Sequence, residues 1–241
     1  MTARGPWRWL RWVIAAAVVI VVLAVAVPFI FFHFVDGSTP APLSLKASAA
    51  PSSAQPASAP PTAGTAPSVA GSWRVSPGSQ VGYRVQEILL GQHHTAVGRS
   101  GSVSGQMVIR GTTVRTASFT VQMATIHTDS AQRDAQFDGR IMDVAAYPTG
   151  KFVLTRPVNL APVPAVGAIS SYTATGQLTL RGHSVLVTFP VRAERTSSGF
   201  EIQGSIRVLF SRWDIPNPSF TGFVTTQNHG IMEFLLDFKP G

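Results

Sequence analysis

No cysteine occurs among the 241 residues, so the chain forms no disulfide and carries no thioether-linked lipid anchor. Charge is also sparse, at 12% of residues, and unbalanced, with 19 Lys and Arg against 11 Asp and Glu. A nucleic-acid groove usually gathers its basic residues into clusters. Here no three basic residues are consecutive. We therefore predict no nucleic-acid partner and favour a solvated cationic surface, with attraction to anionic lipid headgroups as the alternative.

Motifs of common enzyme classes are absent from the sequence as well. It has no G-x-S-x-G nucleophile elbow, no P-loop and no G-x-G-x-x-G dinucleotide fingerprint. It has no H-E-x-x-H motif, and no two histidines are four residues apart, as a helical zinc site requires. We predict no cofactor, no metal site, no catalytic residues and no enzymatic activity, although side chains distant in sequence can still meet in space.

A long uncharged run follows the basic N-terminus. Arg4, Arg8 and Arg11 precede it, and residues 13–35 carry no formal charge. About 20 apolar residues cross a bilayer, and flanking arginines usually stay cytoplasmic. We predict a cytoplasmic segment at 1–12 and a single transmembrane signal anchor at 13–35, which would place the domain beyond it outside the cytoplasm, on the cell membrane. A cleaved signal peptide is the alternative, since residues 24–26 (AVA) resemble a cleavage site.

The next 35 residues, 36–70, are dominated by small residues and proline. They include seven Pro, seven Ser and ten Ala, and only Asp36 and Lys46 are charged. Such a composition buries too little apolar surface to offset the entropy of ordering the chain. We predict a disordered, extended linker, which rises about 3 Å per residue where it is polyproline-like. It leads to a folded domain at 71–241.

Alternation of apolar and polar residues dominates this predicted domain. In the runs 80–86 and 118–124 every second side chain is apolar, and 231–238 repeats the pattern on one face. Gly182 and His183 separate two β-branched runs, which is a hairpin signal. A period of two residues at short spacing predicts about eight strands in an all-β sandwich or barrel.

One charged stretch breaks the alternation. Residues 133–143 (RDAQFDGRIMD) hold five charged side chains, and Asp129 precedes Gln132 by three positions. That spacing resembles a helix N-cap with its capping-box partner, so we predict one short helix here. The acids lack the D-x-[DN]-x-[DN]-G spacing of a calcium loop. Ion pairing of Arg133 and Arg140 with neighbouring carboxylates is therefore favoured over a metal loop or a catalytic carboxylate pair.

The same region resembles the central signature of the YceI-like domain family. Residues 128–155 show a threonine turn, an Arg-Asp pair, a short helix and then Tyr-Pro before a strand. The matching positions are Thr128, Arg133, Asp134, Phe137, Tyr147, Pro148 and Phe152. Residues 176–182 (GQLTLRG) are similar to the family's Gly-Leu-Thr hairpin. The resemblance covers nearly all of 71–241, while residues 210–238 depart from the commoner ending.

This resemblance implies a lipocalin-like antiparallel β-barrel with a polyisoprenoid ligand inside it. An eight-stranded barrel is just wide enough to enclose one slender ligand, and each buried methylene contributes about 0.8 kcal/mol. On the alternating faces we expect Phe137 and Phe152 to gate the end near the helix. The full set of predicted ligand-binding residues is Val81, Tyr83, Val85, Phe119, Val121, Met123, Phe137, Phe152, Leu178, Leu180, Met232, Phe234 and Leu236.

Three functions remain open from the sequence. The resemblance implies a membrane-anchored extracytoplasmic protein that holds a polyisoprenoid or isoprenoid-quinone chain for transport, storage or sequestration. The second is a packed barrel with a structural or interaction role. The third, less favoured, is an enzyme acting on such a lipid, with Asp134 or a histidine as acid or base. A continuous apolar cavity favours the first, a filled barrel the second, and a buried carboxylate facing a histidine the third.

Overall fold

The computed structural model describes residues 12–22, 39–45, 68–89, 91–220 and 224–241. It divides the chain into two units, Met1–Thr39 and Pro40–Gly241. In the first unit, residues 12–22 form a helix whose side chains are exposed. No helix within the described ranges is both long and apolar enough to span a bilayer. Residues 1–11 and 23–35 of the predicted N-terminal segment and anchor lie outside those ranges, so the anchor stays a prediction.

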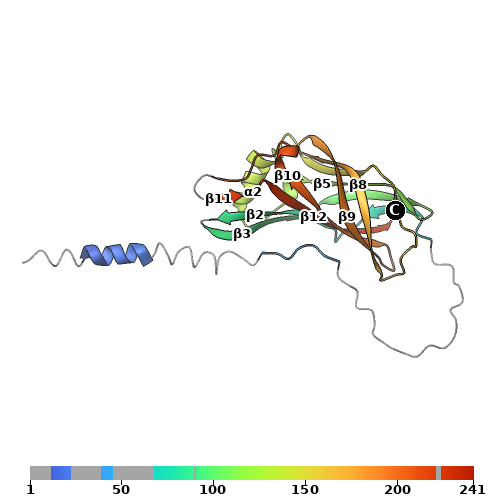
Figure 1. Cartoon of the computed structure of the whole chain (residues 1–241), viewed down its shortest axis with the longest axis horizontal. Helices are drawn as coiled ribbons and strands as arrows, with labels where there is room; N and C mark the ends of the chain where they lie inside the picture. Colours follow the sequence, from blue (N-terminus) through green and yellow to red (C-terminus); the bar gives the residue numbers. More distant parts are fainter. Residues whose placement is uncertain (1–11, 23–38, 46–67, 90, 221–223) are drawn as a thin grey trace, which may run out of the picture. The chain divides into compact units, whose positions relative to one another are not determined.

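Eight strands of the second unit close into an antiparallel barrel (Figure 1). Around the barrel their order is β1, β4, β5, β6, β8, β9, β10 and β12, and the pairing of β1 with β12 closes the ring. Their bounds are Gly71–Val75 (β1), Val103–Arg110 (β4), Thr113–Gln122 (β5), Thr149–Leu154 (β6), Ile169–Leu180 (β8), His183–Arg195 (β9), Phe200–Leu209 (β10) and His229–Pro240 (β12). The predicted all-β antiparallel barrel is confirmed. The sandwich is excluded because the hydrogen-bonded ladder continues around the whole ring.

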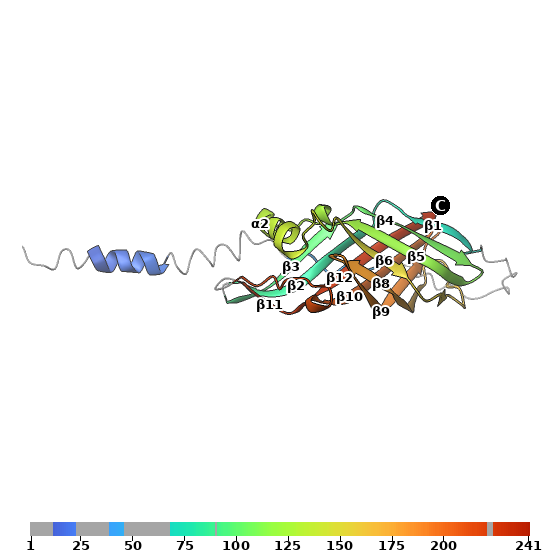
Figure 2. The same ribbon diagram turned by 90° about the horizontal axis from the view of Figure 1, so that it is seen from above.

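Further strands extend this ring. β2 (Gln80–Leu89) pairs with β12, while β3 (Gln92–Ser100) and β11 (Val224–Thr226) pair with β2. β7 (Val158–Asn159) pairs with the beginning of β5. β2, β3 and β11 extend the wall toward the end of the barrel where the helix α2 lies, and the C-terminus lies at the other end (Figure 2). The two ends of the barrel therefore differ in construction.

The hairpin between β8 and β9 turns at Arg181 and Gly182, one residue earlier than the predicted Gly182-His183 turn. Their φ angles are 46° and 76°, and positive φ at both central residues is what a two-residue type I′ turn requires. A Cβ on Gly182 would lie 2.7 Å from the Tyr147 ring. Glycine is therefore required here both by the turn and by the packing against it.

The charged stretch forms a helical insertion between β5 and β6. Helix α2 spans Ala131–Gln136 and continues into the π-helical turn η3, Phe137–Ile141. The Ser130 hydroxyl accepts a hydrogen bond from the Arg133 amide at 3.4 Å. The Asp129 carboxylate accepts instead from the Arg133 guanidinium. The short helix is confirmed, but the predicted cap is wrong by one residue, because Asp129 is engaged by a side chain and Ser130 caps the helix.

Part of the predicted linker contacts the barrel. Within residues 40–45 the Leu43 amide donates to the Glu233 carboxylate of β12 at 3.1 Å, and the Leu45 side chain is buried. Of the predicted disordered linker, 36–70, residues 36–38 and 46–67 lie outside the described ranges, so disorder there stays a prediction. Residues 40–45 thus form a short covering segment on the outer face of the barrel wall, whereas Val69, near the end of the predicted linker, is buried in the core.

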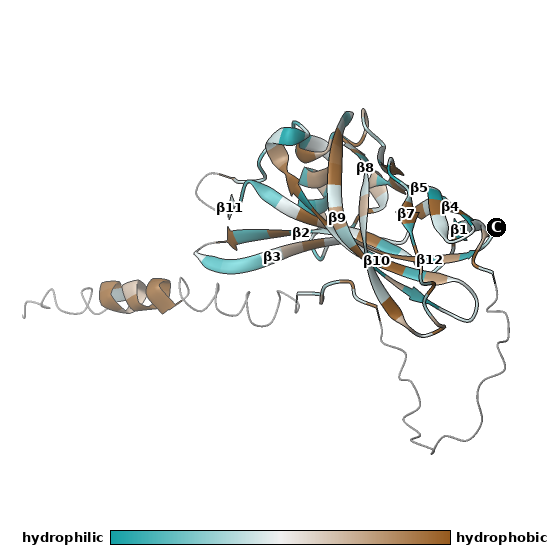
Figure 3. Ribbon diagram, turned by 45° about the vertical axis from the view of Figure 1, so that its right-hand side comes forward, coloured by the Kyte–Doolittle hydropathy of each residue, from teal (hydrophilic) through white to brown (hydrophobic). Residues whose placement is uncertain are grey.

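Hydrophobic and hydrophilic residues alternate along the strands (Figure 3). The buried apolar side chains form one continuous core. At the α2 end the core includes Trp213, which follows the short helix η4 (Phe210–Arg212). Trp213 is fully buried, and its indole N–H donates to the Leu178 carbonyl at 3.0 Å. This tryptophan lies in the region that departs from the commoner family ending, so the departure supplies a core side chain that anchors the 210–218 segment to β8.

Candidate functional site

The barrel interior holds a first chamber at its α2 end, with a volume of about 140 Å³. Its wall comes from β2, β5, β8, β10 and β12, and it is completed by the helical insertion and by residues around Ile215. The inner strand positions that line it are apolar, among them Val81, Val121, Leu178 and Met232. An apolar cavity of about 150 Å³ stays dry and holds a benzene-sized molecule. The first chamber therefore suits a compact hydrocarbon group.

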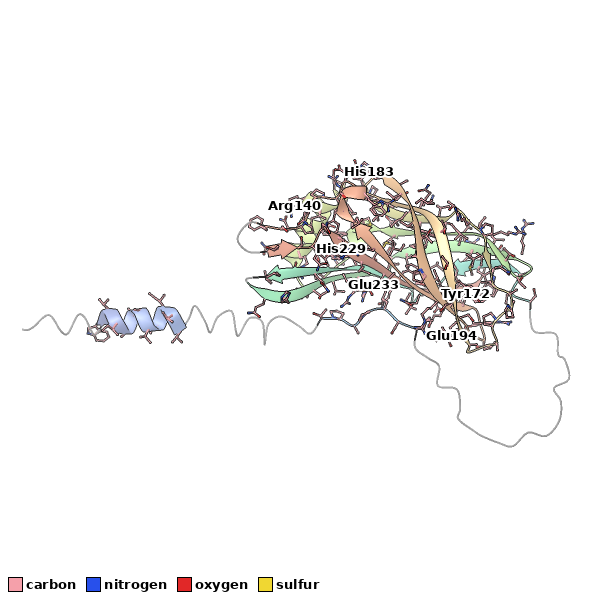
Figure 4. All side chains as sticks on the ribbon, in the orientation of Figure 1. Arg140, Tyr172, His183, Glu194, His229 and Glu233 are labelled. Carbon is pink, nitrogen blue, oxygen red and sulfur yellow. The ribbon has the colours of Figure 1, made fainter. Side chains whose placement is uncertain are left out.

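A second chamber of about 110 Å³ lies toward the opposite end of the barrel. Met107, Ile109 and Phe200 are among the apolar residues that line it. Of the described residues around it, Arg195 is the one with a charged side chain, and its guanidinium donates to the Pro164 carbonyl at 3.4 Å. Figure 4 labels Tyr172 and Glu194 at this end, away from Arg140 and His183 at the α2 end. The second chamber is thus also suited to hydrocarbon.

Four phenylalanines from four strands of the ring separate the two chambers. Phe119 (β5) lies 5.4 Å from Phe152 (β6), and Phe152 lies 5.4 Å from Phe189 (β9), measured between ring centroids. Phe189 lies 6.0 Å from Phe234 (β12), and Phe234 lies 5.3 Å from Phe119. Each ring therefore contacts two others in a closed set, which we call the phenylalanine ring. Phe119 and Phe234 line both chambers.

Charged side chains gather at the rim of the first chamber, where β2, β3 and α2 meet. The buried Glu87 carboxylate lies 3.0 Å from His94 Nδ1, its cross-strand neighbour, and accepts from the Arg133 guanidinium at 3.3 Å. Arg133 also pairs with Asp129, so the predicted ion pairing of Arg133 is confirmed. The rim cluster (Glu87, His94 and Arg133) provides hydrogen-bonding groups beside an apolar cavity. Such an arrangement suits a ligand with a polar end and a hydrocarbon chain.

Tyr83 connects the rim to the chamber. Its ring stacks on Phe137 of η3, with centroids 5.2 Å apart and planes inclined by 10°. Burial raises the pKa of the Tyr83 phenol, and the nearby Arg133 charge opposes that rise only in part. The side chain therefore remains neutral through the physiological range. Stacked on Phe137, it closes the first chamber near the helical insertion.

Asp134, which the sequence left open as a catalytic acid or base, is engaged in hydrogen bonds that stabilise the fold. Its carboxylate accepts from the Thr128 amide at 2.9 Å and from the Thr128 hydroxyl at 2.7 Å, and it lies 3.3 Å from His127 Nδ1. It ties the helical insertion to the preceding turn and lines neither chamber. Among the described residues, no three His, Cys, Asp or Glu side chains are placed to hold a metal ion.

Arg140 departs from its predicted role. Its guanidinium donates to the backbone carbonyls of Asn217 and Pro218, at 3.1 and 3.2 Å, and to the Gln136 side chain at 3.3 Å. In the described part of the chain these acceptors take the place of the expected carboxylate. Arg140 therefore joins the helical insertion to the 210–218 segment.

All thirteen predicted ligand-binding residues face one of the two chambers. Eleven of them line the first chamber, and these are Val81, Tyr83, Val85, Phe119, Val121, Met123, Phe137, Leu178, Leu180, Met232 and Phe234. Phe152 and Leu236 line the second. The expectation that Phe152 gates the helix end is therefore wrong, because it belongs to the phenylalanine ring farther inside. That these side chains bind a ligand stays a prediction.

Several residues of the chamber walls were not predicted from the sequence. Phe189 is one of them, although the run 183–191 alternates as clearly as the others and offered a usable signal. The rim cluster was missed as a unit because Glu87 and His94 meet only through the β2–β3 register. The η4 region with Ile215 reaches the chamber from an irregular segment, where no periodic pattern exists to reveal it.

Comparisons with known proteins agree with this architecture. Residues 73–234 match the model of the YceI-like domain family. A polyisoprenoid binding domain from Saccharophagus degradans, implicated in plant cell wall breakdown, superposes with a TM-score of 0.59 at 15% identity, covering 71% of this chain and 99% of that one. BcnA of Burkholderia cenocepacia superposes with a TM-score of 0.52 at 20% identity, covering 67% and 98%. At these identities the structural likeness establishes a shared fold. Among curated proteins, none matches this chain.

Proposed function

The chain belongs to the YceI-like domain family, and from this premise and the geometry of its barrel we propose that it binds the hydrocarbon chain of an isoprenoid lipid. The first chamber carries the proposal, because its wall is apolar and its rim holds Arg133 and Glu87. The hydrocarbon would lie in the chamber, and the polar end of the lipid would face the rim cluster. The fold of this family is that of binding proteins, which also favours binding over catalysis.

Energetics favour such a ligand over a polar one. Each methylene moved from water into the chamber contributes about 0.8 kcal/mol. A polar group placed against the same wall without a partner costs roughly 1–3 kcal/mol. The chamber therefore selects for hydrocarbon, whereas the rim selects for a single polar end.

We include a membrane anchor in the proposal. Its support is the arginine-rich N-terminus followed by the uncharged run 13–35, a distribution typical of a helix with its N-terminus in the cytoplasm. The barrel would then lie outside the cytoplasm on the cell membrane. From there it would transport, store or sequester a lipid that is poorly soluble in water.

The binding proposal is tested with the purified full chain. Native mass spectrometry with lipid extraction is expected to show one isoprenoid lipid per chain, or one added farnesol molecule when the preparation is lipid-free. A chain that carries no lipid and does not bind farnesol would overturn the proposal.

One alternative is a packed barrel with an interaction role. The observation in its favour is the size of the chambers, about 140 and 110 Å³, each close to that of a cavity for one small aromatic molecule. In a packed barrel the phenylalanine ring would serve the core alone. Addition of bulk at Val121 separates the two functions, because it would displace a ligand from an open chamber but overpack a filled core.

The other alternative is an enzyme, favoured by one contact. Glu87 is buried and lies 3.0 Å from His94 Nδ1, which is the carboxylate–histidine geometry used in acid–base chemistry. Arg133 occupies the same carboxylate, which favours a structural ion pair. Turnover of a bound prenol by the wild type, lost in Glu87→Gln with binding intact, would support the enzyme.

A further inference from the structure

The two chambers meet at the side chains of Phe119 and Phe234, which line both of them. The four rings of Phe119, Phe152, Phe189 and Phe234 are each at most 7% exposed. Their centroids are 5.3–6.0 Å apart around the set, which is contact distance for aromatic pairs. Every ring of the set therefore contacts one neighbouring ring on each side.

Glycines in the barrel wall accommodate two of the rings. A Cβ on Gly176 would lie 2.5 Å from Phe152 Cζ, and a Cβ on Gly204 would lie 2.5 Å from Phe234 Cζ. Gly204 is also the direct cross-strand partner of Phe234. The Phe152 and Phe234 rings therefore pack directly against the backbone of these two glycines. In this position the other two phenylalanines of the ring can contact them.

The polar groups are distributed unequally between the two ends. Glu87, Arg133 and Lys151 are among the residues lining the first chamber, whereas Arg195 alone is charged among the described residues lining the second. A lipid whose polar end rests at the rim cluster has its hydrocarbon directed toward the phenylalanine ring. The ring is then the first barrier that the chain meets.

We propose that the phenylalanine ring is a chain-length stop, so that the protein buries a short isoprenoid segment in the first chamber and excludes longer segments from the second. This inference rests on the proposed function, because it assumes an isoprenoid in the first chamber. The volume agrees with it, since about 140 Å³ is close to the cavity that holds one six-carbon ring. The second chamber becomes available to the chain only when the ring is broken.

The test is a length series of prenols, with two, three and four isoprene units (geraniol, farnesol and geranylgeraniol), bound to the purified full chain. For the wild type, affinity is expected to change by less than about threefold from farnesol to geranylgeraniol. Each additional buried methylene would otherwise raise affinity about fourfold. The length at which affinity stops rising is the quantity that the ring determines.

Phe189→Ala opens the ring without removing a residue that lines the first chamber. Its affinity for geranylgeraniol is expected to exceed that for farnesol by at least about tenfold, because more methylenes enter the second chamber. Phe189→Leu is a milder variant that keeps the test informative if the alanine variant unfolds. Phe200→Ala is the matched control, since Phe200 lines the second chamber and packs on Trp73 but lies outside the ring; its length series should match the wild type.

Two results would overturn the chain-length stop while leaving lipid binding intact. One is a wild-type affinity that keeps rising through geranylgeraniol, and the other is an unchanged series in a cooperatively folded Phe189 variant. Failure of the wild type to bind any of the three prenols would overturn the proposed function together with this inference.

Discussion

Single side chains decide how the rim of the barrel is closed, and Tyr83 is the most informative of them. It stacks on Phe137 and fills the space above Gly98, where a Cβ would lie 2.4 Å from Tyr83 Cε1. Burial raises the pKa of its phenol from the ordinary value of 10.0. A glycine on β3 and a neutral tyrosine on β2 thus form one packing unit, which alkaline pH should disturb.

Tyr83 predicts a specific loss of stability at high pH. Below about pH 10 the phenol is neutral in both the folded and unfolded states, so its full contribution is present. Above that pH the unfolded state loses the proton first, and the free energy of unfolding falls by up to about 1.4 kcal/mol per pH unit. Urea titrations between pH 9 and 11 should show this loss in the wild type and in Tyr172→Phe, but less of it in Tyr83→Phe. Equal slopes in all three chains would contradict the assignment.

Val121 tests whether the first chamber receives a ligand. Its side chain lines that chamber and is 7% exposed. Val121→Trp should fill the space and displace bound prenol with little loss of stability, whereas in a packed core the same change typically costs 1–3 kcal/mol. Thr120→Trp on the outer face is the control, and it should retain both the melting temperature and the bound prenol. Loss of stability in Val121→Trp, with no prenol bound by the wild type, would favour the packed barrel.

Among the elements, the helical insertion and the covering segment extend the barrel in different ways. The helical insertion is joined to β2 through Arg133 and Glu87 and to the 210–218 segment through Arg140. The covering segment, residues 40–45, lies against the outer wall. One element therefore closes the cavity, and the other covers the buried carboxylate of Glu233.

Removal of Arg133 should destabilise the fold. Glu87 would remain buried without its guanidinium partner, and both side chains are less than a quarter exposed, at 8% and 21%. Hydrogen bonds to charged groups contribute about 1.5–3 kcal/mol, so the melting temperature of Arg133→Ala should fall by several degrees. Arg140→Ala, which breaks exposed bonds to backbone carbonyls, is expected to change it far less. An unchanged melting temperature with prenol binding abolished would instead identify Arg133 as a ligand contact.

Glu233 holds the covering segment in place. The carboxylate is 4% exposed, lies between Arg84 and Arg99, and accepts from the Leu43 amide. The same arginines donate to backbone carbonyls within residues 40–45, at 2.6 and 3.0 Å. One carboxylate, two backbone carbonyls and two guanidinium groups thus form one network that joins residues 40–45 to β2, β3 and β12.

Because the natural chain has no cysteine, a single introduced thiol reports on this segment. Leu45→Cys should react slowly with a maleimide, since Leu45 is 8% exposed, and the exposed position in Ser44→Cys should react quickly. Adding Glu233→Gln should accelerate labelling of Leu45→Cys several-fold, because the segment loses its charged acceptor. Rapid labelling of Leu45→Cys with Glu233 intact would show that the segment is not bound to the barrel.

The sequence predicts these elements unequally. Alternation located most of the strands and the inward faces, since a strand with one buried face must repeat every two residues. It did not predict that Phe119, Phe152, Phe189 and Phe234 meet, because contacts across a barrel depend on strand order and register. The turn at Arg181 and the cap at Ser130 were each displaced by one residue, since local hydrogen bonding decides such positions.

At the scale of the whole molecule, an uncharged N-terminal run and a barrel proposed to bind lipid belong to the same chain. The proposed anchor would hold the barrel beside the reservoir from which an isoprenoid must come. Binding and anchoring are separate proposals, however, because the proposed binding depends on the barrel alone and the proposed anchor on the N-terminal run. Each is therefore tested alone.

The anchor predicts a defined topology. Protease added to intact cells should degrade the barrel. The full chain should remain in the membrane fraction after carbonate extraction, because the uncharged run would hold it there. Replacing Arg4, Arg8 and Arg11 by glutamate should reduce the fraction of correctly oriented chains, because cytoplasmic retention follows positive charge. Protection of the wild-type barrel until the membrane is broken would contradict the orientation.

The central claim is that the first chamber binds isoprenoid hydrocarbon. Native mass spectrometry of the purified full chain, performed on the wild type and on Val121→Trp with farnesol added in equal amounts, tests it most directly. One lipid or farnesol molecule is expected on the wild type, and at least about a tenfold lower occupancy is expected on the folded variant. Equal occupancy in both, or none in the wild type, would contradict it.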